Sequence, residues 1–209
     1  MLHYETIAPA TLGLLKKLMA DDDMPDFQLV GGTSLALQLG HRKSIDLDLF
    51  TNVEFDLDYC LDVLRNRYGL RLSYLRRQSI KGDIEGVKID CIAHRYPWIR
   101  PAVVESGIRL ASLEDVCAMK LNAISGNGTR IKDFVDIAEL SGIFTFSEML
   151  HFYVEKYNAN SIIPEKSVTY FNDINFAEPV MLTGDRNLDW EQCANRIKTM
   201  VKNPDKIVK

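Results

Sequence analysis

Residues 29–34 read Leu-Val-Gly-Gly-Thr-Ser, and residues 44–50 read Ser-Ile-Asp-Leu-Asp-Leu-Phe. Polar and apolar residues alternate in the second stretch, which is the period of a β-strand whose successive side chains point to opposite faces. The first stretch is typical of a short buried strand that ends at two glycines, with a short helix after them. The alternation predicts two faces for the second strand, one with Asp46, Asp48 and Phe50 and the other, in the core, with Ile45, Leu47 and Leu49.

Two carboxylates, those of Asp46 and Asp48, would then stand close together on one face of a strand and repel each other. A hard divalent cation removes that repulsion, and Mg²⁺ prefers carboxylate oxygens together with substrate phosphates. A third carboxylate is expected on the strand 87–93, where Lys88 and Asp90 share a face. It could hold a second ion and deprotonate an attacking hydroxyl, as phosphoryl transfer requires. The pattern therefore predicts a site for Mg²⁺, with Mn²⁺ as the alternative ion, formed by Asp46, Asp48 and Asp90.

Gly31 and Gly32 precede the predicted helix. Because glycine has no side chain, backbone amides and the helix N-terminus can approach phosphate oxygens closely there. The hydroxyls of Thr33 and Ser34 could cap the helix or donate to phosphate. Each feature alone has an ordinary explanation, since an alternating strand is usually half exposed, a Gly-Gly pair is usually a turn, and Asp90 could face solvent. Together, and in this order along the chain, they favour a triphosphate site.

The remaining hydrophobic pattern predicts a mixed first half and a helical second half. A helix is expected from Pro9 to about Ala20 and another at 57–68, followed by strands at 71–77, 79–85 and 87–93. Pro97 and Pro101 mark a loop, so we expect two domains, residues 1–105 and residues 106–209. The second domain is predicted to contain helices at 112–125, 131–140, 146–157, 164–172 and 188–201.

The composition is that of a soluble globular protein, with 46% hydrophobic and 26% charged residues. No apolar run is long enough to span a bilayer and no secretory signal is visible, so we expect a cytoplasmic protein. Four dispersed cysteines predict buried free thiols rather than disulfides or a zinc site. A net charge of −4 gives no global attraction to nucleic acid. A local basic patch, or equally a solvated surface, is formed by Arg65, Arg67, Arg71, Arg76, Arg77 and Lys81.

The spacing of the glycine pair and the Asp-Leu-Asp-Leu strand resembles the fingerprint of the polymerase-β nucleotidyltransferase superfamily. Residues 30–37 and 40–49 are similar, more narrowly, to the AbiEii/AbiGii-type toxin nucleotidyltransferases, and the resemblance spans about 27–140. It implies an α+β fold, in which a polymerase-β-like domain with a small mixed sheet is followed by a helical region that closes the active-site cleft. Lys88 matches the family's Lys-x-Asp block, and the resemblance implies that it contacts the triphosphate.

Lys120 occupies an unusual position on the helix predicted at 112–125. It falls in the middle of the apolar stripe, between Cys117 and Ile124, where an uncompensated charge is costly. Its side chain must therefore either extend to water or meet an anion. Residues 118–124 match a further block of the AbiEii-type family, and the resemblance implies that Lys120 contacts the phosphates of the nucleotide.

Residues 130–137 resemble the last block of the same family. The helical pattern alone predicts a solvated polar face for Lys132, Asp133 and Asp136. The resemblance implies instead that both aspartates face the cleft between the domains and that Lys132 assists in nucleotide binding.

The residues and the resemblance together predict an NTP-dependent, Mg²⁺-dependent nucleotidyltransferase that moves an NMP to an acceptor hydroxyl on tRNA or protein. The family implies a toxin of an AbiE-like toxin–antitoxin pair in phage defence, with a cognate antitoxin and no membrane partner. Two alternatives stay open. One is a module with this fold that binds a nucleotide or a partner without turnover, and the other is a metal-dependent phosphohydrolase with water as the acceptor.

Overall fold

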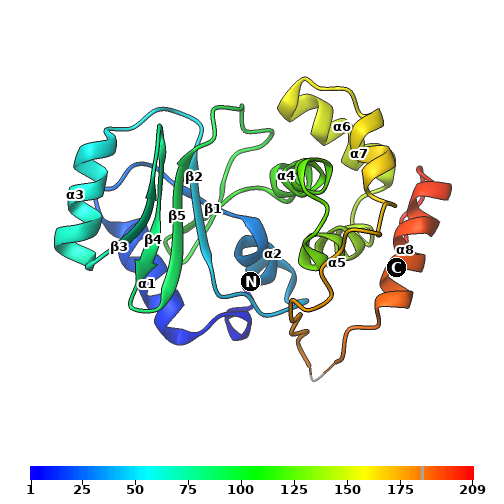
Figure 1. The fold of residues 1–209 in the computed structure, drawn as a ribbon, viewed down its shortest axis with the longest axis horizontal. Helices are drawn as coiled ribbons and strands as arrows, with labels where there is room; N and C mark the ends of the chain where they lie inside the picture. Colours follow the sequence, from blue (N-terminus) through cyan, green and yellow to red (C-terminus); the bar gives the residue numbers. More distant parts are fainter. Residues whose placement is uncertain (185) are drawn as a thin grey trace. The chain divides into compact units, whose positions relative to one another are not determined.

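The strand that carries Asp48 lies in the middle of a mixed sheet of seven strands, whose order is β3-β4-β5-β2-β1-β7-β6 (Figure 1). The computed structural model describes residues 1–184 and 186–209. β2 runs parallel to β5 and antiparallel to β1, so the two acidic strands are direct neighbours. The strands are β1 Gln28–Val30, β2 Leu47–Thr51, β3 Arg71–Leu75, β4 Ser79–Ile84, β5 Val87–Ala93, β6 Val103–Glu105 and β7 Ile108–Leu110.

Helices α1 and α3 cover one face of this sheet (Figure 1). α1 begins at Pro9, where the fixed φ of proline suits the first helical turn, and α3 is capped by the Asp56 carboxylate. Their apolar sides join the alternate residues of the central strands in one core, which includes Leu15, Leu64 and Cys91. The polar residues that alternate with these core residues lie on the other face of β2, β4 and β5. The first-half helices are η1 Tyr4–Thr6, α1 Pro9–Ala20, α2 Gly31–Leu39 and α3 Leu57–Tyr68.

Two local predictions in this half are wrong. α2 begins at Gly31, directly after the strand, so neither Thr33 nor Ser34 caps it. β2 begins only at Leu47, so the alternation does not extend to Ile45, which is 58% exposed instead of lying in the core. The end of α2 agrees with the prediction, because Gly40 takes the left-handed conformation that stops the helix.

The chain divides into two compact units, Met1–Ser112 and Leu113–Lys209. The division expected after residue 105 falls between β6 and β7, which form a hairpin that we did not predict. β7 also pairs in parallel with β1 through Leu110 and Leu29, so this hairpin belongs to the sheet of the first unit. Each strand has three residues, which is too short for an alternating pattern to be visible in the sequence.

The second unit is helical, as predicted. α4 packs against α5, α6 and α7, and α5 packs against α8. The helix predicted at 164–172 is shorter and begins earlier than expected. No described helix is both long and apolar enough to cross a bilayer. The helices are α4 Leu113–Gly126, α5 Ile131–Leu140, α6 Phe146–Tyr157, α7 Ile162–Ser167 and α8 Trp190–Lys202.

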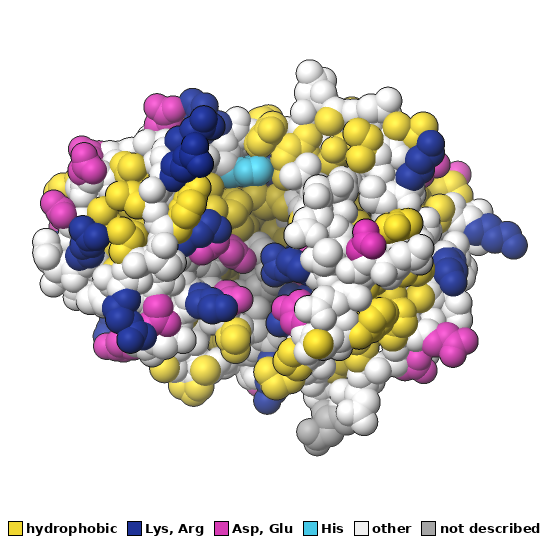
Figure 2. Space-filling model, viewed as in Figure 1, with side chains coloured by type: hydrophobic (Ala, Val, Ile, Leu, Met, Phe, Trp, Pro, Cys, Tyr) yellow, Lys and Arg dark blue, Asp and Glu magenta, His cyan; other side chains and the backbone are white. Residues whose placement is uncertain are grey.

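The cysteines and three residues of the predicted basic patch have ordinary environments. All four cysteines are buried free thiols, as predicted. Of the predicted basic patch, Arg67 binds Asp21 and Asp23, while Arg71 and Lys81 bind carboxylates of the sheet. Figure 2 likewise shows one face of the molecule on which basic and acidic side chains are interspersed. These basic residues therefore do not form a surface of a single charge.

The Asp21 carboxylate at the end of α1 accepts hydrogen bonds from Tyr68 (2.6 Å) and Arg67 (2.5 Å) on α3. The hydrogen bond from Tyr68, with a smaller contribution from Arg67, lowers the pKa of Asp21 despite its burial. A carboxyl group with a lowered pKa in the folded state stabilises the fold above its unfolded pKa of about 3.9. That stabilisation is lost as the pH falls through the folded value.

We therefore expect Arg67→Gln to lower the thermal midpoint at pH 7 and to lose that effect as the pH falls below about 4. Thermal unfolding followed by circular dichroism across this range measures the difference between variant and parent. Arg65→Gln, an exposed arginine on the same helix, is the matched control. A difference that stays constant with pH would show that the Asp21 charge does not contribute.

Candidate active site

The centre of the candidate site is a pair of carboxylates on adjacent parallel strands. In the ladder between β2 and β5, Asp48 is paired with Asp90. Residues paired in this way point to the same face of a sheet, and neighbouring strands lie about 4.8 Å apart. Both side chains are partly exposed, whereas the residues on either side of each, such as Leu47 and Ile89, are buried. The alternation thus directs the carboxylates to the face opposite the core.

The glycine pair lies directly beside this carboxylate pair. Val30 is paired with Asp48 in the antiparallel ladder, so the chain turns into α2 next to it. Gly31 has φ +68°, and a Cβ there would overlap the Asp48 carboxylate. A Cβ on Gly32 would overlap the guanidinium of Arg42, which is 3% exposed. Both glycines are therefore required by close approach, one to an acidic group and the other to a basic group.

Lys81 of β4 completes the row across the sheet. It is paired with Asp90 in the ladder, and its ammonium forms an ion pair with the Asp90 carboxylate. We did not predict this contact, although the signal was present. The turn after Ile84 places Ile84 opposite Val87. Three residues further from the turn on each strand, Lys81 of β4 is therefore opposite Asp90 of β5. Lys88, two residues before Asp90, is exposed on the same face.

Asp46, Thr33 and Ser34 have different roles from one another. Asp46 lies one residue before β2 and is partly exposed. The Thr33 hydroxyl donates to the Asp46 carbonyl and lies 2.8 Å from the Ser44 hydroxyl, so it ties α2 to the segment that carries Asp46. Ser34 is fully buried and accepts a hydrogen bond from Gln38. The structure therefore gives both predicted hydroxyls partners inside the first unit.

The carboxylates of Asp46, Asp48 and Asp90 fit a Mg²⁺ site. Among the described residues, no three histidine, cysteine, aspartate or glutamate side chains are already gathered as a metal site. Mg²⁺, however, is usually held by one or two carboxylates together with substrate phosphates and waters. Asp48 and Asp90 supply two carboxylates from adjacent strands, and Asp46 supplies a third nearby in the chain. The remaining oxygens would come from the triphosphate.

Lys120 in the second unit meets two anions. Its ammonium lies 2.6 Å from an oxygen of Asp133 and 2.7 Å from one of Asp136. Lys120 is 5% exposed, and the two aspartates are 1% and 0% exposed. The alternatives of a lysine that extends to water and of aspartates on a solvated face are therefore wrong. The three groups form one buried cluster that joins α4 to α5.

The second unit contains further ion pairs, and one of them includes Lys132, which was predicted to assist in nucleotide binding. Lys132 lies 2.8 Å from Glu178, and both side chains are partly exposed. Lys156 on α6 and Asp115 on α4 form a fully buried pair at 2.7 Å, which sequence reasoning missed. Burial lowers the pKa of Lys156, and Asp115 opposes that shift. Because these two residues lie 41 positions apart in the chain, no local pattern could have indicated the pair.

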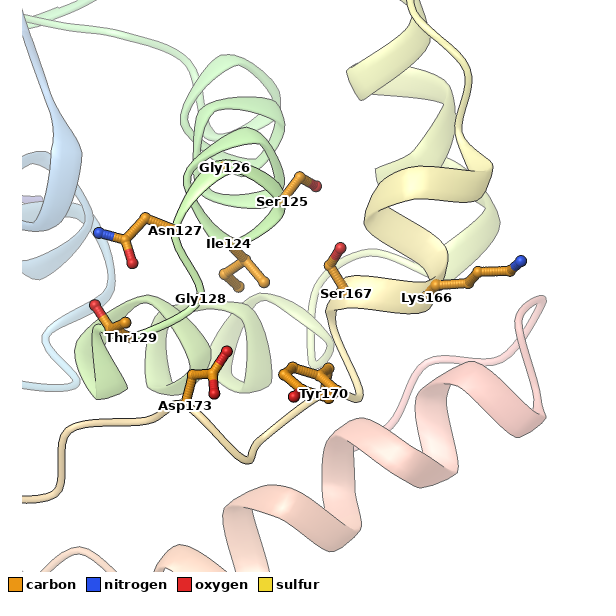
Figure 3. A pocket seen from close by; sticks show the side chains of 10 residues that line it. All are labelled: Ile124, Ser125, Gly126, Asn127, Gly128, Thr129, Lys166, Ser167, Tyr170 and Asp173. Atoms are coloured by element: carbon orange, nitrogen blue, oxygen red, sulfur yellow. The ribbon is translucent and has the colours of Figure 1, made fainter.

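A separate pocket of about 440 Å³ lies in the second unit (Figure 3). It is lined by Gly126 at the end of α4, by residues 127–129 of the loop before α5, and by Lys166, Tyr170 and Asp173. None of the predicted site residues lines it.

Comparison with known proteins places these features in a family. The model of the family described as "Nucleotidyl transferase AbiEii toxin, Type IV TA system" matches residues 13–67 and 62–206. An uncharacterized protein of Aquifex aeolicus (strain VF5) is 31% identical over 169 residues, which are 76% of this chain and 80% of that protein.

Solved structures share the fold. A candidate nucleotidyltransferase from Helicobacter pylori has a TM-score of 0.60 at 18% identity, covering 94% of this chain and 95% of that one. The nucleotidyltransferase toxin MenT4 of Mycobacterium tuberculosis H37Rv has a TM-score of 0.59 at 14% identity, covering 93% and 83%. At such identities the likeness concerns the fold alone.

Proposed function

Because this chain belongs to the AbiEii family of nucleotidyltransferase toxins, we propose that it transfers a nucleoside monophosphate from a triphosphate to an acceptor hydroxyl at the Asp48–Asp90 pair. The observation that carries the proposal is the position of this in-register pair beside the Gly31 turn. Acidic groups next to a glycine turn that opens a helix suit a metal-bound triphosphate, because the metal ion takes the carboxylates and the helix N-terminus favours phosphate.

Each residue around the Asp48–Asp90 pair has a distinct proposed task. The amides after Gly31 and Gly32 receive the β- and γ-phosphates, and Arg42 adds a positive charge behind that turn. Asp46, Asp48 and Asp90 would hold Mg²⁺, which neutralises the phosphate charge when it is bound. Lys81 orients the Asp90 carboxylate, and Lys88 contacts the triphosphate from the same face.

The transfer step itself needs a base and an in-line approach. Asp90 accepts the proton of the acceptor hydroxyl, whose oxygen then forms a bond to the α-phosphorus. The bond between the α-phosphorus and the bridging oxygen breaks, and pyrophosphate leaves with that electron pair. The side chains that carry the charge are held by the sheet, so little rearrangement is needed at the moment of reaction.

The second unit contributes in a different way. We propose that the buried Lys120–Asp133–Asp136 group positions α4 and α5, since Lys120 is already neutralised by two carboxylates. A contact between Lys120 or Lys132 and phosphate, as the family resemblance implies, would require exchange of these partners. The family also supports the proposal that the chain is the toxin of a toxin–antitoxin pair with a cognate antitoxin. We further propose tRNA as one acceptor that the radiolabel test below can identify.

The decisive test compares triphosphates that carry the radiolabel on the α-phosphate with those that carry it on the γ-phosphate. We expect radiolabel from an α-labelled triphosphate to become attached to cellular RNA or protein, while label from a γ-labelled triphosphate is released as pyrophosphate. Chelation of the divalent ion with EDTA should abolish transfer, and Mg²⁺ in excess should restore it. Release of α-label as free nucleotide without attachment would show a hydrolase. Triphosphate binding with neither product would show a module without turnover.

A further inference from the structure

The pocket of about 440 Å³ in the second unit has a lining that favours one kind of ligand (Figure 3). Its volume lies within the range of cavities that bind small molecules. Two serine hydroxyls line it, those of Ser125 on α4 and Ser167 on α7, together with the Asp173 carboxylate and the Tyr170 ring. None of these residues has a task in the transfer proposed above.

The two serine hydroxyls offer a ligand only acceptor oxygens. The Ser125 hydroxyl donates to the Leu121 carbonyl at 2.7 Å. The Ser167 hydroxyl donates to the Ile163 carbonyl at 2.8 Å. A hydroxyl has one proton and two lone pairs, and a carbonyl oxygen cannot donate, so the proton of each serine is already engaged within its own helix. Both groups therefore present lone pairs to the pocket.

The other polar groups of the lining add negative charge. The Asp173 residue is exposed, and its carboxylate has no ion pair or hydrogen bond with any residue among 1–184 and 186–209. The lining also includes Gly126 at the C-terminus of α4, where a helix presents carbonyl oxygens and the negative end of its dipole. Lys166 carries a positive charge, but its side chain extends away from the other labelled side chains (Figure 3). The interior of the pocket thus favours a cation.

The apolar part of the lining indicates which cation fits. Tyr170 is 52% exposed, and the face of its ring attracts a cation, while Ile124 adds an aliphatic surface. Acceptor oxygens favour a cation that can donate N–H groups, which a quaternary ammonium lacks. We propose that the pocket binds a protonated aliphatic amine of the diamine or polyamine class. Its ammonium groups donate to the serine oxygens and to Asp173, and its methylene chain lies against Tyr170 and Ile124.

The position of the pocket gives binding a measurable consequence for stability. Residues 127–129 of the lining connect α4, which carries Lys120, to α5, which carries Asp133 and Asp136. A ligand that binds only the folded chain stabilises it by mass action. We therefore expect the thermal midpoint to rise with the concentration of the amine. This site does not depend on the transfer proposed above.

The test is titration calorimetry of the full chain with spermidine, in the absence of triphosphate and RNA, whose phosphates would themselves bind the amine. We expect saturable binding to the parent. Asp173→Asn should weaken it by about 10- to 100-fold, because a charge-assisted hydrogen bond is lost. Tyr170→Leu should weaken it by about 2- to 30-fold, and Tyr170→Phe, which keeps the ring, should stay close to the parent. The matched control is Glu165→Gln, an exposed carboxylate on α7 outside the lining, which should bind like the parent.

Several outcomes would overturn the inference. The absence of saturable binding to the parent would remove the site. Equal losses in Asp173→Asn and Glu165→Gln would show a general attraction of a polycation to an acidic protein. Tetramethylammonium that binds as tightly as spermidine would mean that the acceptor oxygens contribute nothing, and this comparison needs no variant. Tighter binding of Nα-acetyl-lysine amide than of spermidine would assign the pocket to a lysine side chain of another protein. Because the assay contains no triphosphate, failure of the proposed transfer would leave its result interpretable.

Discussion

Replacement of Asp48 by asparagine is expected to lower the rate of label transfer by at least about 100-fold, because it removes a charge that the transition state needs. Asparagine has nearly the shape of aspartate, so the contact with Gly31 survives while the negative charge is lost. Asp48 is only partly buried, and it stands beside the like-charged Asp90. The variant is expected to keep the fold, because asparagine fills the same partly exposed position on β2.

The matched control is Asp83→Asn. Asp83 lies on β4, two residues after Lys81 and hence on the same face, and it forms an ion pair with Arg71. This substitution should leave transfer within a few-fold of the parent. Initial rates with α-labelled triphosphate, together with thermal unfolding of each variant, give the comparison. Asp48→Asn with a rate close to the parent, or Asp83→Asn with an equal loss, would contradict the assignment.

Replacement of Lys120 by methionine is expected to destabilise the protein by about 3–5 kcal/mol, because two buried carboxylates lose the ammonium that both of them contact. The Lys156→Met variant provides the comparison, since it leaves Asp115 buried without its ammonium partner and should cost a similar amount. Denaturant unfolding measures both free energies. A loss below about 1 kcal/mol in Lys120→Met would mean that the buried group is not a structural ion pair.

The same two variants test whether Lys120 also binds the nucleotide. Triphosphate affinity in the presence of Mg²⁺ is measured at a temperature where both variants are folded. If the role of Lys120 is confined to positioning α4 and α5, its variant and Lys156→Met should show equal affinities. A loss confined to Lys120→Met would establish the phosphate contact that the family resemblance implies.

Much of the fold was predictable, because the period of the hydrophobic residues in a long segment indicates whether it is a helix or a strand. The helix at 57–68 and the strand at 87–93 agree with the structure residue by residue, since Gly69 and the Glu85-Gly86 turn mark their boundaries. Short segments carry too few residues for a period, and this is why the β6–β7 hairpin was missed. Ile45 was misplaced because alternation continues in the sequence beyond the point where strand pairing begins.

The candidate site was predictable to the extent that it depends on the local sequence pattern. The alternation around Asp48 and Asp90 predicted the face that each occupies, and the ladder of β2 with β5 brings the two together. The buried state of Asp133 and Asp136 was not predictable, because it depends on Lys120 from another helix.

The most direct measurement is a crystal structure of the protein with Mg²⁺ and a non-hydrolysable triphosphate. The account predicts a metal ion bound by Asp48 and Asp90 oxygens at about 2.0–2.1 Å, with the outer phosphates on the amides after Gly31. A triphosphate bound elsewhere on the chain, or a metal ion that touches neither carboxylate, would contradict it.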